Sequence, residues 1–242
     1  MIGTVLLGFV LLFALSAVFF DAKGSDCGSR ISAILAGLAA VGASAVLFAV
    51  ILSNDFSYSY VASYSSIDLP LIYKISAFWA GQQGSFLLWL LIHALVGTYM
   101  VCTNRLTATG RIIYHLLTAM LVILVFIKSP FTPAEHIMPD GYGMNPLLQD
   151  PWMAVHPPII FIGYALLAVP FVYSLESMMR SPADGNFLAP MRRWTLIAWS
   201  FLGAGIFIGG YWAYKVLGWG GYWGWDPVEN SSLVPGLVSC IL

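Results

Sequence analysis

The sequence has few charged residues and few cysteines, and both shortages narrow what the protein can be. Only 9% of its 242 residues are Asp, Glu, Lys or Arg, whereas a soluble domain carries about a quarter. The 10 basic and 11 acidic residues leave a net charge of -1, so the chain offers no basic surface for a nucleic acid. The three cysteines form no CxxC pair and therefore give no sign of a zinc site or a disulfide framework.

Long apolar runs are what the sequence has instead. Hydrophobic residues make up 60% of the chain, and its mean hydropathy is +0.85. A helix needs about 20 apolar residues to cross a bilayer, and uncharged runs near this length occupy residues 2–20, 31–52, 86–102, 112–127, 158–175 and 194–212. These runs predict an all-α, polytopic transmembrane helical bundle with six complete spans. A further run from Leu233 predicts the start of a seventh, and residues 1–242 are expected to form a single membrane domain.

Basic residues divide unevenly between the two sets of loops that six crossings create. One set, residues 21–30, 103–111 and 176–193, holds seven of them, and the other side holds only Lys74, Lys128 and Lys215. Because basic loops stay in the cytoplasm, the N-terminus is expected on the outer side of the membrane. The first run has no basic residue before it, which favours a retained helix over a cleaved signal.

Residues 211–232 are rich in tryptophan, tyrosine and glycine. Four tryptophans lie here, namely Trp212, Trp219, Trp223 and Trp225. Glycines leave room beside the indoles, which offer broad apolar faces and one N–H donor each. The segment therefore suits a planar, largely apolar ligand with a polar edge. An interfacial belt of anchors is the alternative, although a belt explains one or two tryptophans at a helix end better than four.

The end of this segment also has a structural explanation. Asp226, Pro227 and Glu229 are spaced like the cap, the first and the third residue of a helix. From spacing alone, Asp226 is expected to cap a helix rather than to bind a ligand.

Several stretches of the sequence resemble one known family. The residues from Trp219 to Asp226 resemble the WWD signature of the haem-handling proteins of cytochrome c maturation. The Pro-Val-Glu-Asn-Ser-Ser that follows is similar to the CcmF branch, the membrane subunit of the cytochrome c haem lyase. Residues 54–62, 69–85 and 145–158 resemble the same branch, in the same order along the chain.

The resemblance implies a function, a location and partners. It implies a multi-pass protein of the inner (cytoplasmic) membrane that binds haem b at its periplasmic face and helps attach it to apocytochrome c. The implied partners are a periplasmic haem carrier, apocytochrome c, other haem lyase subunits and membrane lipid, with no nucleic acid. No catalytic residue is expected, because the thiols of the apocytochrome supply the reacting atoms.

The resemblance also implies a set of haem-binding residues. His156 is expected as an axial ligand of the iron, and the WWD segment is expected to hold the ring. Lys215 is added from its position as an outer-face cation inside the Trp-rich segment, where it could meet the propionates. The full set is His156, Trp212, Lys215, Trp219, Gly220, Gly221, Tyr222, Trp223, Trp225 and Asp226. For Lys215, snorkelling at a helix end is the alternative.

His156 precedes two prolines. Pro157 is expected to keep the backbone of His156 extended, and Pro158 is expected to be the first residue of the fifth span. The imidazole would then be attached to a rigid part of the backbone. Neutral imidazole is a common axial ligand of haem, and a hydrogen-bonded cap of the fifth span is the alternative. The next histidines of the family pattern would fall beyond Leu242. A rival hypothesis is therefore a non-catalytic haem-binding or relay module of the CcmC or CcsA kind, or an inactive fragment that needs a second chain.

Overall fold

The computed structural model describes residues 1–179, 187–218 and 221–241, and the regular elements in these ranges are all helices. Six are long and apolar enough to cross a membrane: α1 (Ile2–Ala22), α2 (Asp26–Leu52), α5 (Gln82–Cys102), α6 (Ala108–Ile127), α7 (Pro151–Met179) and α8 (Leu188–Val216). Shorter helices are α3 (Ser59–Tyr64), α4 (Leu71–Ser76) and α9 (Pro227–Val238). The predicted all-α bundle of six spans, with a further helix begun near the C-terminus, is confirmed.

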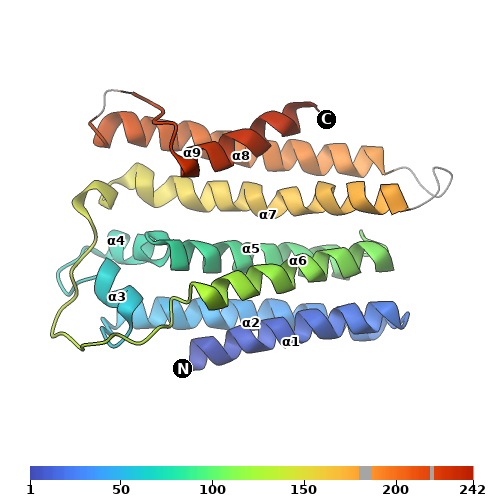
Figure 1. Ribbon diagram of the computed structural model, residues 1–242, viewed down its shortest axis with the longest axis horizontal. Helices are drawn as coiled ribbons and strands as arrows, with labels where there is room; N and C mark the ends of the chain where they lie inside the picture. The colour runs from blue at the N-terminus through green and yellow to red at the C-terminus, as the bar shows by residue number, and fades with distance from the viewer. Residues whose placement is uncertain (180–186, 219–220, 242) are drawn as a thin grey trace.

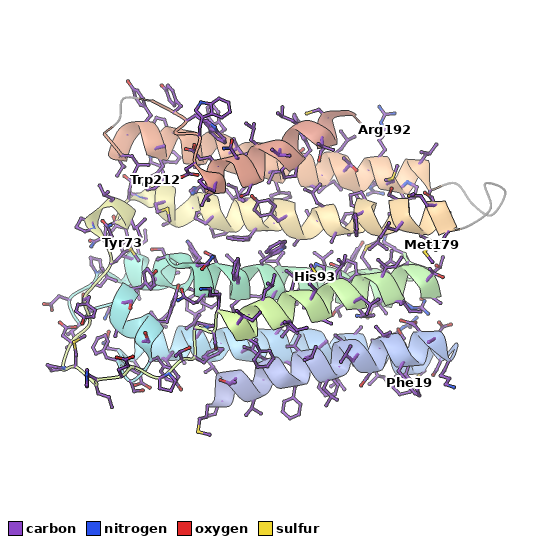
Figure 2. All side chains as sticks on the ribbon, viewed as in Figure 1. Phe19, Tyr73, His93, Met179, Arg192 and Trp212 are labelled. Atoms are coloured by element: carbon purple, nitrogen blue, oxygen red, sulfur yellow. The ribbon has the colours of Figure 1, made fainter. Side chains whose placement is uncertain are left out.

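The long helices run alongside one another, and their connections gather at the two ends of the bundle (Figure 1). One end, called here the outer-loop end, carries residues 53–81, 128–150, 217–218 and 221–226. The opposite, short-loop end carries the tight turns between α1 and α2 and between α5 and α6. Figure 2 shows Tyr73 and Trp212 at the first end and Phe19, Met179 and Arg192 at the second. The two loop sets inferred from the sequence therefore lie at opposite ends.

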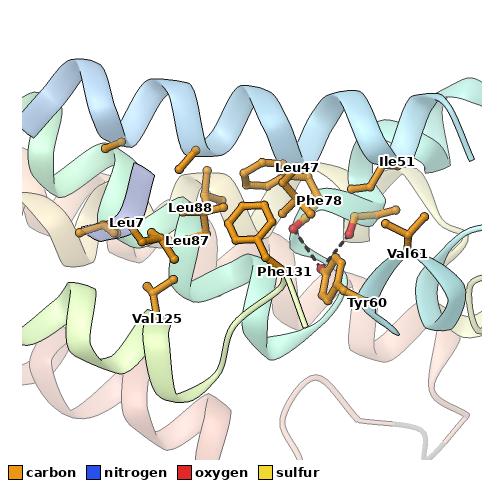
Figure 3. Packing of buried hydrophobic residues seen from close by; sticks show 14 of the residues in the cluster. Leu7, Leu47, Ile51, Tyr60, Val61, Phe78, Leu87, Leu88, Val125 and Phe131 are labelled. Atoms are coloured by element: carbon orange, nitrogen blue, oxygen red, sulfur yellow. Dashed lines mark hydrogen bonds between the residues drawn. The ribbon is translucent and has the colours of Figure 1, made fainter. Parts of the chain in front are cut away.

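The main core lies among α1, α2, α5 and α6, closed at the outer-loop end by the segments that carry Phe78 and Phe131 (Figure 3). Tyr60 on α3 fixes this closure. Its hydroxyl lies 2.8 Å from the carbonyl oxygen of Ala77 and 3.0 Å from that of Phe78, and it accepts from the Gly81 N–H at 3.2 Å. Burial raises the pKa of Tyr60, so the phenol keeps its proton and donates. The start of α5 is thereby held against α3.

Helices α7 and α8 form a close antiparallel pair beside this core (Figure 1). Glycine makes the close approach possible. A Cβ added to Gly163 would lie 2.9 Å from the backbone nitrogen of Leu202, and one added to Gly205 would lie 2.3 Å from Cγ1 of Ile160. Small residues at such crossings let two membrane helices pack backbone to backbone. Side chains on α7 and α8 near the outer-loop end are thus brought within contact distance.

The start of α7 differs from the prediction. The helix begins at Pro151 and includes His156, Pro157 and Pro158, so the expected extended backbone at His156 and the opening of the span at Pro158 are wrong. Asp150 explains the early start, since its Oδ1 accepts from the Trp152 N–H at 2.9 Å and caps the helix before the prolines are reached. The prolines then remove two backbone donors from a helix that has already begun.

A partly buried ion-pair cluster joins three helices at the short-loop end. Arg111 on α6 donates from Nε to Asp21 on α1 at 2.7 Å and from Nη2 to Asp26 on α2 at 2.5 Å. Ser29 donates to the second oxygen of Asp21 at 2.9 Å. The Asp21 side chain is fully enclosed, and both of its oxygens are satisfied.

Candidate functional site

His156 lies on α7 against α8, toward the outer-loop end. A Cβ added to Gly209 on α8 would be 3.2 Å from its Nδ1, so glycine leaves the space that the imidazole occupies. The Trp212 ring meets the imidazole edge to face, with 5.7 Å between ring centroids. His156 is partly buried, and its Nδ1 is enclosed without a hydrogen-bond partner in the described part of the chain. An enclosed polar atom of this kind requires an explanation, and a missing ligand is one.

The imidazole forms part of the wall between two cavities. One, of about 300 Å³, lies among α7, α8 and α9 and is lined by residues that include Met153, Gly209, Trp212, Trp223 and Asp226. The other, of about 550 Å³, lies among α5, α7 and α9 and is lined by residues that include Trp79, Gln82, Trp89, Tyr164 and Ser231. Both walls are mainly apolar with a few polar groups, which is the usual character of a small-molecule site.

The Trp-rich segment forms the end of α8, a turn and the start of α9. Trp223 enters the smaller cavity, and its Nε1 is buried without a partner among the described residues. Tyr222 stacks on Tyr214 at 4.4 Å and lines a neighbouring cavity of about 480 Å³. Trp225 has a φ of 57°, a left-handed conformation that costs a non-glycine residue about 1–2 kcal/mol. Its side chain is 71% exposed, so this indole is presented outward.

Asp226 caps α9, as its spacing predicted. Its Oδ1 accepts from the Glu229 N–H at 2.7 Å, and the Glu229 carboxylate accepts in return from the Asp226 N–H at 3.4 Å. The same carboxylate accepts from the Gly224 N–H at 2.7 Å. This reciprocal capping box fixes the turn that carries Trp223 and Trp225. Asp226 also lines the smaller cavity.

Two residues of the predicted set bind the segment that precedes α7. Lys215 donates to Oδ2 of Asp150 at 3.0 Å, and the Trp212 indole donates to the carbonyl oxygen of Leu147 at 3.3 Å. The Lys215 side chain is 49% exposed, so this lysine is neither buried nor simply snorkelling. An ammonium group has three donors, which leaves capacity beyond the bond to Asp150.

The structure brings together His156, Trp212, Trp223 and Asp226 around one cavity, with Lys215 beyond them along α8. Tyr222 and Trp225 turn toward the surface, and Gly221 lies in the turn between α8 and α9. The predicted Trp219 and Gly220 lie outside the described residues.

Sequence reasoning missed Gly209 and Asp150. The signal for Gly209 was a pair of glycines inside a run of large apolar residues. The signal for Asp150 was its position directly before Pro151, where an acidic residue can cap a helix.

The described residues contain no group of three or more His, Cys, Asp or Glu side chains able to hold a metal ion. Around the two cavities, the unpartnered side-chain atoms of the described residues are Nδ1 of His156 and the indole nitrogens of Trp79, Trp89 and Trp223. Enclosed polar nitrogens beside mainly apolar cavities fit a flat organic ligand that carries a few polar groups.

Comparison with known proteins identifies relatives of one kind. The family model described as Cytochrome C assembly protein matches residues 79–242. The chain is 40% identical to the Rhodobacter capsulatus cytochrome c-type biogenesis protein ccl1, over 85% of this chain and 32% of that protein. It is 37% identical to the Escherichia coli cytochrome c-type biogenesis protein CcmF, over 98% of this chain and 38% of that protein.

A solved structure named cytochrome c heme lyase CcmF superimposes with a TM-score of 0.83 at 30% identity. The match covers 99% of this chain and 40% of that one. The chain therefore spans roughly a third of the length of the curated relatives it matches.

Proposed function

The chain belongs to the cytochrome c assembly protein family, among relatives of the CcmF type, and on this basis we propose that it binds haem b at its outer-loop end and holds it for attachment to apocytochrome c. The observation that carries the proposal is the cavity where Nδ1 of His156 and Nε1 of Trp223 are both enclosed without partners. An imidazole beside an apolar cavity with an indole donor suits a porphyrin that has an axial position and a polar edge.

Each residue around the cavity has a distinct role in this proposal. His156 would hold the haem iron, and its place in α7 against Gly209 limits how far the imidazole can move. Trp212 and Trp223 form apolar walls, and the exposed Trp225 extends the surface toward the ring edge. Lys215 keeps donors free for a propionate while it binds Asp150.

The attachment reaction does not require this chain to supply a reacting group. Haem supplies two vinyl groups, and each thiol of the apocytochrome adds its sulfur and hydrogen across one vinyl double bond without a leaving group. The contribution of His156 and the surrounding indoles is to hold the ring in one orientation and to exclude other approaches. We therefore assign positioning, rather than acid or base catalysis, to the residues described.

The proposed partners are a haem carrier, apocytochrome c and further subunits of a haem lyase complex, all acting at the outer-loop end. We place that end in the periplasm, since the short-loop end has the excess of basic residues. A phosphatase that is active only in the periplasm tests the orientation. Fused after Tyr142 it should be active, and fused after Asn104 it should be silent. The reverse pattern would contradict the proposed orientation.

The proposed haem site is tested by the absorption spectrum of membranes that contain the protein. The wild-type protein should show a Soret band that largely disappears in His156→Ala. His136→Ala is the matched control, because this histidine is exposed in an outer loop and its loss should leave the band unchanged. An unaltered band in His156→Ala would refute the assignment of His156. A normal band without covalent cytochrome c would favour the haem-relay alternative over a lyase role.

A further inference from the structure

Asp150, directly before α7, uses both oxygens of its carboxylate. Oδ1 accepts from the Trp152 N–H at 2.9 Å and caps the helix. Oδ2 accepts from Nζ of Lys215 on α8 at 3.0 Å. The residue is only 9% exposed, so this carboxylate is an enclosed junction between two helices.

Three contacts join α8 to α7 and to the segment that precedes α7. Lys215 meets Asp150, the Trp212 indole meets the Leu147 carbonyl, and Gly209 meets the His156 imidazole. Asp150 precedes His156 by the same number of residues as Gly209 precedes Lys215. At 1.5 Å per residue, the ion pair lies about 9 Å along the helices from the imidazole. The ion pair is therefore close enough to set the register of the helix turn that carries His156.

The first turns of α7 need such an external support. Pro157 and Pro158 have no N–H, so the carbonyl groups of Met153 and Ala154 lose their backbone donors. The turn that contains His156 is consequently short of internal hydrogen bonds. The cap at Asp150 and its bond to α8 supply restraint from outside the helix.

From this geometry we propose that Asp150 is a positioning residue for His156. One carboxylate oxygen caps the first turn of α7, and the other binds Lys215 on α8. Together these two contacts hold the His156 imidazole against Gly209. The importance of this for ligand binding rests on the proposed role of His156. The positioning itself does not, and it can be measured without haem.

The haem-free measurement is modification of histidine by diethyl pyrocarbonate in native membranes, followed by mass spectrometry. Asp150→Asn keeps an oxygen for the cap but loses the charge that holds Lys215, and Lys215→Met removes the cation but keeps an apolar stem. Either change should raise the modification rate of His156 several-fold. The double variant should show no further rise, because both changes break the same contact. The exposed His136 serves as the internal reference, and Glu135→Gln is the control for charge loss in an outer loop.

An unchanged rate at His156 in both single variants overturns the proposal, as do single effects that simply add in the double variant. If Asp150→Asn fails to accumulate, Lys215→Met alone decides by the same criterion.

The absorption spectrum then separates this proposal from the proposed function. If both hold, Asp150→Asn weakens the Soret band, and added imidazole restores it by replacing a displaced ligand. If His156 becomes more reactive while the Soret band is unchanged, the positioning role stands and the assignment of His156 to the iron is refuted.

Discussion

The ion-pair cluster around Arg111 at the short-loop end and the cavity beside His156 at the outer-loop end differ in how their polar side chains are paired. At the short-loop end, Arg111 donates to two carboxylates and Asp21 has both oxygens bound. At the outer-loop end, Nδ1 of His156 and Nε1 of Trp223 are enclosed without partners among the described residues. An enclosed, unpartnered polar atom costs about 1–3 kcal/mol. The Arg111 cluster thus stabilises the fold, whereas the unpartnered atoms beside the cavity have the character that the proposed ligand site requires.

Removing one side chain from each end tests this contrast. Of the substitutions considered, Arg111→Ala should give the largest change in the free energy of unfolding. Arg111→Ala leaves Asp21 buried without its cation, which should lower the free energy of unfolding by about 3–5 kcal/mol. His156→Ala breaks no hydrogen bond and should cost about 1 kcal/mol or less. The check is thermal unfolding of the haem-free protein in lipid nanodiscs, with the exposed Arg192→Ala as control. Equal losses in Arg111→Ala and His156→Ala would remove the contrast.

Two glycines on α8 allow a smaller and sharper test. A Cβ on Gly203 meets nothing within 4 Å, whereas one on Gly209 lies 3.2 Å from the His156 imidazole. In Gly203→Ala, the higher helix propensity of alanine should raise the free energy of unfolding by up to about 1 kcal/mol. In Gly209→Ala, the close contact with the imidazole should cancel this increase.

The Soret band distinguishes the two glycine variants further. It should weaken in Gly209→Ala, which displaces the imidazole, and stay unchanged in Gly203→Ala. Identical stability and identical spectra in both variants would show that the close approach of α8 does not hold His156.

The fold was largely predictable because its determinants are local. Each span is a run of apolar residues bounded by polar or charged ones, and burial in lipid requires such runs to be helical. The beginning of α7 was not predictable in the same way. Two prolines normally mark a boundary, but here α7 is already capped at Asp150 before the prolines are reached. The second oxygen of Asp150 binds Lys215 on another helix, a contact that the local sequence does not reveal.

The site was predictable only in part, for a related reason. The resemblance selected His156 and the tryptophans, and the spacing around Asp226 predicted its capping box, which the structure confirms. The packing between α7, α8 and α9 decides which indoles face the imidazole. The inward position of Trp223 and the exposure of Trp225 could therefore not be predicted from the sequence. The close approach at Gly209 is likewise a property of two helices and not of either sequence alone.

The smallest expected effect on stability belongs to Trp223→Phe, which removes the unpartnered N–H and keeps an aromatic ring. The substitution relieves the cost of the unpartnered N–H but loses packing around a smaller ring. These two effects oppose each other, so the free energy of unfolding should change by less than about 0.5 kcal/mol. Haem affinity should nevertheless fall by about tenfold if that N–H donates to the ring edge, since a hydrogen bond is worth about 1 kcal/mol or somewhat more.

Trp199→Phe is the matched control, because its indole already donates to Sγ of Cys240 at 3.0 Å, away from the proposed site. This variant should lose a little stability and keep its haem affinity, the reverse of Trp223→Phe. Titration of each purified variant with haem, together with thermal unfolding, measures both quantities. If Trp223→Phe loses stability and keeps haem, its indole supports the fold in the way that Arg111 does, and the two ends of the bundle do not differ in kind.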